Sequence, residues 1–167
     1  MANIIFIHGL ESSGHGFKAQ FFRKIFPGCI TPDFEPFNNE ISFSLLLKKR
    51  MSQLITILDT KNSWKIIGSS FGSYMAELYA LRYPNKVELL ILLAPLLAIP
   101  ELNPDKYKTI DIPVIIFHGK NDEIVSMKDS RNRAKKLFKN LQFNVVDDDH
   151  LLHSTIAKIN WKEIIKP

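Results

Sequence analysis

One turn of the chain carries a residue that could form a covalent bond with a substrate. Within Ile66–Tyr74, Gly68, Ser70 and Gly72 fit the pattern G-x-S-x-G, between an apolar run and the helix-forming stretch Met75–Leu81. On such a strand-to-helix turn the serine hydroxyl is lifted out of the sheet, and the glycines remove Cβ atoms that would collide with backbone. We therefore predict that Ser70 is a nucleophile. The alternative is a chance match, since the pattern is short and arises in turns rich in Gly and Ser.

A serine nucleophile needs an orienting acid, and an acidic residue follows a later predicted strand. One known chain order is serine, then acid, then histidine. Pro113 to His118 is an apolar run that predicts a strand, and Asp122 lies in the turn beyond it. Asp122 could instead only cap the turn or the next helix, where Asp is common. Glu123 is the neighbouring alternative, but Asp122 fits the pattern better.

The base is expected in the loop after the strand predicted at Leu141 to Val146. His150 is the first histidine past this strand, and His153 lies one helical turn further on. We favour His150, because the base usually lies in the loop itself. Asp147-Asp148-Asp149 is more typical of a solvated turn than of a metal site, because no familiar ligand spacing accompanies it. No metal or organic cofactor is expected.

Two backbone N–H groups must stabilise the oxyanion that forms on the substrate carbonyl. We predict the N–H of Phe71, the residue after the nucleophile, and the N–H of Leu10, in the loop after the first strand. His8 precedes the nucleophile in the chain and is predicted to hold that loop. His118 ends an apolar strand and is expected to be a satisfied near-core histidine, and His15 receives no role.

Strands alternate with helices along the whole chain. Strands are predicted at residues 3–8, 29–31, 64–67, 87–94, 113–118 and 141–146, and helices at 16–26, 41–58, 75–82, 126–139 and 151–159. This alternation predicts a three-layer α/β/α sandwich with a mainly parallel sheet of about six strands. Ligands of such sheets bind at the carboxyl ends of the strands, and each candidate site residue follows a strand.

Bulk properties narrow the class of protein. With 167 residues and a net charge of +5, the chain is expected to form one domain over residues 1–167. Lys48-Lys49-Arg50 and Lys135-Lys136 lie on amphipathic stretches and are interpreted as solvated helix faces. No basic block with interleaved aromatic residues suggests a nucleic-acid partner. The positive net charge would favour an anionic substrate.

The single cysteine and the apolar segments indicate where the protein resides. Cys29 cannot form an internal disulfide and is expected to serve packing, which suits a reducing compartment. The run Ile4–Ile7 is too short for a signal peptide, and Leu89–Pro100 is too short to span a bilayer and contains two prolines. We expect a cytoplasmic protein without a membrane span.

Together these residues resemble a small α/β-hydrolase. The resemblance rests on His8-Gly9-Leu10, the elbow around Ser70, His118-Gly119 with Asp122, and Asp149-His150. The N-terminal part of the sequence is similar to that of the short, lidless bacterial esterases of the YqiA type, in the stretch Leu10-Glu11-Ser12-Ser13 followed by Lys18-Ala19-Gln20. Ser73 departs from many relatives, which carry a second glycine there.

The resemblance implies a carboxylesterase or acyl-CoA thioesterase acting on small acyl esters or thioesters. It also implies a sheet that starts at the oxyanion strand, without the first two strands of larger hydrolases. A non-catalytic binding protein and an amide or peptide hydrolase with the same triad remain alternatives. The substrate pocket is expected between residues 35–43 and 95–107, where Phe37, Phe43, Leu96 and Leu97 could line it or pack under loops.

Overall fold

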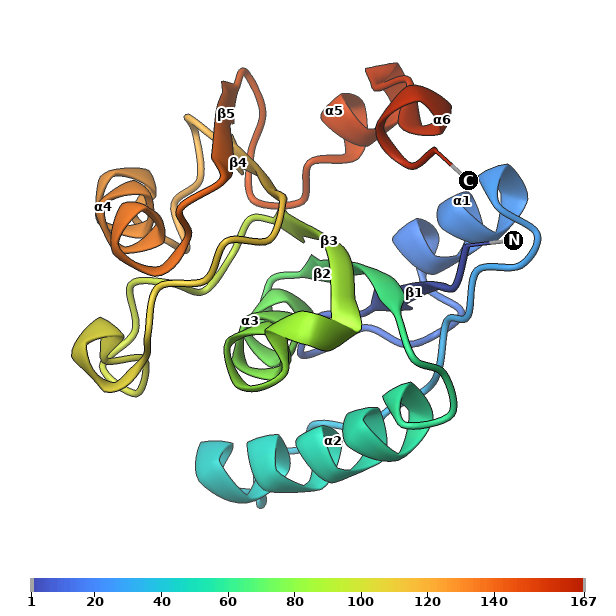
Figure 1. Cartoon of the computed structure of the whole chain (residues 1–167), viewed down its shortest axis with the longest axis horizontal. Helices are drawn as coiled ribbons and strands as arrows, with labels where there is room; N and C mark the ends of the chain where they lie inside the picture. The colour runs from blue at the N-terminus through green and yellow to red at the C-terminus, as the bar shows by residue number, and fades with distance from the viewer. Residues whose placement is uncertain (1, 167) are drawn as a thin grey trace.

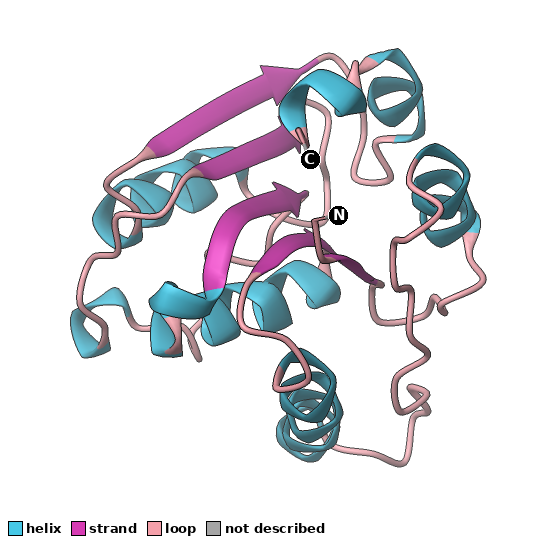
Figure 2. Ribbon diagram, turned by 45° about the vertical axis from the view of Figure 1, so that its right-hand side comes forward, coloured by secondary structure: helices cyan, strands magenta, loops and turns pink. Residues whose placement is uncertain are grey.

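Five parallel strands form one sheet at the centre of the computed structural model, which describes residues 2–166 (Figures 1 and 2). The strands lie side by side in chain order: β1 Ile4–Ile7, β2 Trp64–Ser69, β3 Val87–Leu93, β4 Val114–Gly119 and β5 Leu141–Val146. β2 lies inside the sheet, where Ile66 is paired with Ile5 on one side and with Leu90 on the other. The inner strands are continuous apolar runs because helices cover both faces of the sheet.

The helices form two layers around this sheet (Figure 1). One face is covered by α2 Phe43–Leu58, α3 Phe71–Arg82 and α4 Met127–Leu137, and the other by α1 Phe17–Ile25, α5 His153–Lys158 and α6 Trp161–Ile164. Two short 3₁₀ turns, η1 Pro84–Lys86 and η2 Pro104–Lys106, complete the described elements. Neighbouring strand residues point to opposite layers: Ile66 packs in the core under α2 and α3, and Ile67 packs in the core under α1 and α6. The predicted three-layer α/β/α architecture is confirmed.

The sheet has five strands because the strand predicted at residues 29–31 is reduced to a single bridge. The Ile30 N–H donates to the Ile4 carbonyl at 2.9 Å, and the Ile30 carbonyl accepts the Phe6 N–H at 2.9 Å. Pro32 follows two residues later and has no N–H with which to continue the ladder. The segment therefore protects the outer edge of β1 without becoming a full strand.

The helix predicted at residues 151–159 is also shorter than predicted, and a further short helix, α6, follows it. Leu152 holds a left-handed backbone conformation, with φ of 56°, so α5 begins only at His153. This bend leaves His150 in an irregular loop after β5. No helix within residues 2–166 is both long enough and apolar enough to cross a bilayer.

A carboxyl group lies in the core on α3. Glu77 is fully buried, and within the described chain neither of its oxygens has a hydrogen-bond partner. Burial raises the pKa of Glu77 well above its ordinary value of 4.5. The folded protein therefore keeps a proton at pH values at which the unfolded chain has lost it. As the pH rises above the ordinary Glu pKa of 4.5, the folded state binds more protons than the unfolded state does. The free energy of unfolding contributed by Glu77 therefore falls as the pH rises.

We expect Glu77→Met to raise the free energy of unfolding by about 1–3 kcal/mol, because the variant removes an unpartnered buried polar group. The gain should increase as the pH rises above the ordinary Glu pKa of 4.5, measured by urea unfolding at a series of pH values. Glu40→Met, on the exposed surface, is the matched control and should show no such increase. A gain that is the same at every pH would contradict the retained proton.

Candidate active site

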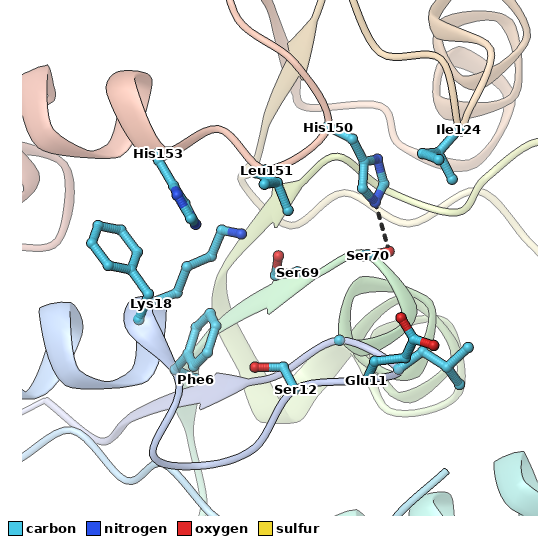
Figure 3. Close-up of a pocket in the computed structure, with 13 residues that line it drawn as sticks. Phe6, Glu11, Ser12, Lys18, Ser69, Ser70, Ile124, His150, Leu151 and His153 are labelled. Atoms are coloured by element: carbon cyan, nitrogen blue, oxygen red, sulfur yellow. Dashed lines mark hydrogen bonds between the residues drawn. The ribbon is translucent and has the colours of Figure 1, made fainter. Parts of the chain in front are cut away.

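Ser70 lies between the end of β2 and the start of α3. Its backbone has φ of 53° and ψ of −116°, a conformation that residues other than glycine rarely adopt. The Ser70 N–H donates to the Leu93 carbonyl of β3 at 2.9 Å, which ties the turn to the sheet. The Ser70 hydroxyl makes no helix-capping hydrogen bond. Figure 3 shows it at the carboxyl end of the strand, open to a pocket.

Close backbone contacts hold this turn in place. A Cβ atom on Gly72 would collide with the carbonyl oxygens of Ile7 and His8, and one on Gly68 would lie 2.6 Å from the Ser73 Cα. The steric role predicted for the two glycines therefore agrees with the structure. The contacts also press the start of α3 against the end of β1, which brings the turn beside the loop that follows β1.

Ser73 contributes a hydrogen bond to the turn. Its hydroxyl donates to the Ser70 carbonyl at 2.5 Å and accepts the Leu96 N–H at 3.3 Å. The side chain therefore connects the turn to the loop after β3.

The structure brings Ser70, His150 and Asp122 into one hydrogen-bonded line. His150 Nε2 lies 3.0 Å from Ser70 Oγ (Figure 3), and His150 Nδ1 lies 2.8 Å from Asp122 Oδ2. With Asp122 ionised, Nδ1–H donates to the carboxylate, and Nε2 is left to accept the Ser70 hydroxyl proton. The Asp122 side chain is fully buried and that of His150 is 17% exposed, so little water competes for these hydrogen bonds.

The Asp122 carboxylate is surrounded by donors. Its Oδ1 accepts the backbone N–H groups of Ile124 at 2.8 Å and Val125 at 2.9 Å, and its Oδ2 accepts from His150 and lies 3.2 Å from His118 Nε2. Burial by itself raises the pKa of Asp122, but the hydrogen bonds from Val125, His150 and Ile124 outweigh burial and hold the pKa below its usual 3.8. The carboxylate is therefore ionised at neutral pH and keeps a fixed orientation.

His118 has a role that its position at a strand end did not reveal. Its Nε2 lies 3.2 Å from the Val125 carbonyl and the same distance from Asp122 Oδ2, and burial lowers the pKa of His118. Neutral His118 can therefore donate Nε2–H to both acceptors. The expectation of a satisfied core histidine was wrong in one respect, since among the described residues its Nδ1 has no partner. The four-residue spacing from His118 to Asp122 across one turn was the available signal.

The alternative residues for the acid and the base lie elsewhere. Glu123 is exposed and is not among the hydrogen-bond partners of His150 in the described chain. The His153 ring packs against Phe17, with the ring centroids 4.2 Å apart and the ring planes tilted by 39°. His15 is exposed and pairs with Asp33 at 3.2 Å.

The loop after β1 lies directly beside the serine. A Cβ atom on Gly9 would lie 3.6 Å from the Ser70 Cβ, and Leu10 lines the same pocket as Ser70. His8 donates from Nδ1 to the Gly9 carbonyl at 2.8 Å, and its Nε2 accepts the Phe34 N–H at 3.2 Å. In a trans peptide the C=O and N–H groups point in opposite directions. Fixing the Gly9 carbonyl therefore also fixes the direction of the Leu10 N–H, one of the two predicted oxyanion donors.

Arg50 is a site residue that the sequence interpretation missed. It is fully buried, and it donates to the Gly9 carbonyl at 3.2 Å, the Leu10 carbonyl at 2.9 Å and the Glu35 carbonyl at 2.8 Å. Its guanidinium carbon lies 5.1 Å from the centroid of the Phe71 ring, a cation–π contact. Arg50 therefore contacts both residues predicted to supply the oxyanion donors.

The assignment of Arg50 to a solvated helix face was therefore wrong. Arg50 shares one face of α2 with Leu46, Leu54 and Leu58, all of them buried. This spacing of four residues places the arginine on the apolar stripe, which was the signal in the sequence. A buried guanidinium needs several acceptors, and the carbonyls of the loop after β1 supply them.

A cavity of about 420 Å³ opens beside Ser70. It is lined by the following residues: Phe6, Gly9, Leu10, Glu11, Ser12, Phe17, Lys18, Ser69, Ser70, Ile124, His150, Leu151 and His153 (Figure 3). The cavity therefore lies between the loop after β1, α1 and the loop that carries His150.

The expected pocket walls at residues 35–43 and 95–107 were wrong. Neither segment lines the cavity beside Ser70. Leu97 is fully buried in the core, Phe37 and Leu96 pack against that core, and Phe43 contacts Phe71 edge-on at 5.3 Å. These loops cover apolar surface of the core under α2 and α3, so their side chains are occupied by packing.

The acidic turn before His150 is built from internal contacts. Asp148 Oδ2 accepts the N–H and the hydroxyl of Thr155, both at 2.8 Å, and Asp147 pairs with Lys120 at 3.0 Å. Across residues 2–166, no three or more His, Cys, Asp or Glu side chains converge as a metal site would require.

Comparison with known proteins shows which family the chain belongs to. The family model described as "Alpha/beta hydrolase family" matches residues 37–155, more than half of the chain. The chain belongs to the alpha/beta hydrolase family. The matched region includes Ser70, Asp122 and His150. A search of curated protein sequences found no match.

Solved structures share the fold of this hydrolase-family chain at low sequence identity. Alpha/beta hydrolase domain-containing protein 10 from mouse is 20% identical, with a TM-score of 0.76 over 97% of this chain and 89% of its own. The Bacillus cereus carboxylesterase is 18% identical, with a TM-score of 0.71 over 94% and 84%. Est1E from Butyrivibrio proteoclasticus, solved with ferulic acid bound, is 16% identical, with a TM-score of 0.74 over 98% and 90%.

If Arg50 aims the oxyanion donors, Arg50→Lys should slow the labelling of Ser70 by a fluorophosphonate probe roughly tenfold or more. Lysine keeps the charge but cannot donate to three carbonyls in the fixed geometry of a guanidinium, and the loss of one oxyanion donor costs about 10²–10³ in rate in other enzymes. The measurement is the labelling rate constant, together with the melting temperature.

Arg133→Lys is the matched control. Arg133 also donates to two loop carbonyls, those of Ile99 and Leu102, but it lies on α4 outside the cavity. We expect it to lower the melting temperature without slowing labelling. Equal labelling rates for the two variants at matched fractions folded would contradict the positioning role of Arg50.

Proposed function

We propose that this protein is a serine hydrolase that cleaves carboxylic esters or thioesters of small molecules through an acyl-enzyme on Ser70. The observation that carries the proposal is the line of hydrogen bonds from Ser70 through His150 to Asp122, which begins at a strained strand-to-helix turn. Membership of a hydrolase family and the esterases among the similar folds also support it.

In the proposed first half-reaction, the Ser70 hydroxyl attacks the acyl carbonyl and gives its proton to His150 Nε2. Asp122 keeps the His150 Nδ1 proton in place and stabilises the imidazolium that forms. The N–H groups of Leu10 and Phe71 would stabilise the tetrahedral oxyanion. His150 then returns the proton to the departing alcohol or thiol, which leaves Ser70 acylated.

In the second half-reaction, water replaces the leaving group. His150 takes a proton from the water molecule as it attacks the acyl-enzyme, and the same two N–H groups stabilise the second oxyanion. When this intermediate collapses, the carboxylic acid is released and His150 Nε2 returns the proton to Ser70 Oγ, which restores the hydroxyl.

The finer family assignment is part of the same proposal. The stretches Leu10–Ser13 and Lys18–Gln20 are similar to the opening of the lidless YqiA-type bacterial esterases, and a carboxylesterase or acyl-CoA thioesterase is the activity that this resemblance implies. The first activity screen should therefore use short acyl esters and acyl thioesters.

The decisive test is labelling with a fluorophosphonate, which reacts with a serine that a base and an oxyanion hole activate. We expect the label on the peptide that contains Ser70, located by mass spectrometry, and no label in Ser70→Ala. Ser70→Ala should also lower kcat by orders of magnitude while the protein stays folded. Esterase activity retained in a folded Ser70→Ala protein would contradict the proposal.

His150→Ala and His153→Ala distinguish the two candidate bases. We expect His150→Ala to match the loss in Ser70→Ala, because residues of one triad act as a unit. His153→Ala should retain most of the labelling rate, because the His153 ring lies against Phe17 and not against Ser70. The measurement is the labelling rate constant of each folded variant, and the reverse order would assign the base to His153.

A further inference from the structure

Lys18 is a cation in the cavity that the proposed chemistry does not use. It lies on α1 and lines the same cavity as Ser70, and Figure 3 shows its ammonium group directed into that cavity. In the part of the chain that the structure describes, Lys18 has no ion-pair partner within 4.0 Å and makes no side-chain hydrogen bond. The nearby carboxylates make hydrogen bonds within their own loop: Asp148 accepts from Thr155, and Asp149 Oδ1 accepts the Leu151 N–H at 2.9 Å.

The surroundings of Lys18 are largely apolar. Phe6, Phe17 and Leu151 line the cavity with it, and Phe17 and Leu151 are each 52% exposed at its mouth. Burial lowers the pKa of Lys18, and Asp149 and Asp148 act in the opposite direction. A partly desolvated ammonium group gains more from a charged partner than one in bulk water does. The site thus combines apolar contact area with one cation that has no protein partner.

We propose that Lys18 binds a carboxylate carried by the substrate, so that the preferred substrates are esters or thioesters with a free carboxylate at one end. This inference rests on the proposed hydrolase function. The scissile carbonyl would lie at Ser70, the apolar part of the substrate against Phe17 and Leu151, and the carboxylate at the ammonium group of Lys18.

The other charged group of the cavity fixes the direction of binding. Glu11 also lines the cavity, and in Figure 3 it lies on the opposite side from Lys18. Its carboxylate would repel an anion at that side. A single cation opposite a carboxylate matches a monoanion better than a phosphate dianion, which is why we infer a carboxylate. The net charge of +5 also favours the approach of an anion.

The test compares esters that differ in one carboxylate. Para-nitrophenyl hexanoate and mono-para-nitrophenyl adipate place the change on the acyl side, and phenyl acetate and para-acetoxybenzoate place it on the alcohol side. For the wild-type protein we expect kcat/KM to be higher for the anionic member of at least one pair. In Lys18→Met the anionic-to-neutral ratio of kcat/KM should fall roughly tenfold, mainly through KM, because a hydrogen bond to a charged group is lost. Lys18→Arg should restore most of the ratio.

Lys24→Met is the matched control, because it removes the same charge from the same helix at a position outside this cavity. Its anionic-to-neutral ratio should equal that of the wild-type protein. A ratio that falls equally in Lys18→Met and Lys24→Met would reflect the net charge alone and would overturn the carboxylate site. Hydrolysis of both members of each pair without an effect of Lys18→Met would overturn it while leaving the hydrolase proposal intact. If the folded wild-type protein hydrolyses none of the four esters and takes no fluorophosphonate label, the proposed function fails, and the carboxylate site fails with it.

Discussion

The strained backbone of Ser70 depends on the close approach of α3 to the end of β1. A residue in such a conformation is less stable by about 1–3 kcal/mol and persists only where its surroundings leave no alternative. Gly72 supplies that constraint, since its missing Cβ lets the helix lie against the carbonyls of Ile7 and His8. The same contact places the loop after β1 beside Ser70. The nucleophile and its predicted oxyanion donors are therefore positioned by one packing arrangement.

Charge in the site is balanced by fixed donors. The Asp122 carboxylate is out of contact with water, yet backbone N–H groups and two imidazoles satisfy its oxygens. A buried carboxylate without such partners is too unstable to remain charged. Glu77 on α3 illustrates this, because burial raises its pKa and the group keeps its proton. Arg50 follows the same rule with opposite sign, because its guanidinium is buried against three carbonyl oxygens. Both buried ions hold loops in place, and Lys18 differs from them in facing a cavity.

Much of the site could be read from residue types and their order. The elbow around Ser70 has a steric signature, and the turn chemistry after two later strands marked Asp122 and His150. Parallel strands bring their carboxyl ends to one edge, so residues that follow strands were expected to meet there. Apolar runs of five strands were long enough to identify. The run at residues 29–31 is also apolar, but it forms only one bridge because the proline that follows has no N–H to continue the ladder. An apolar pattern by itself does not show where a strand's hydrogen bonds end.

The sequence by itself determined the layered architecture and the order of nucleophile, acid and base, because periodicity and turn chemistry are local properties. Tertiary structure decided the rest. It separated His150 from His153 by a bend at Leu152, turned Arg50 toward the core, and placed the cavity next to α1 instead of the loops at 35–43 and 95–107. These outcomes depend on which faces meet across long sequence separations. A side chain that is polar in the sequence can lie inside wherever distant backbone carbonyls supply its partners.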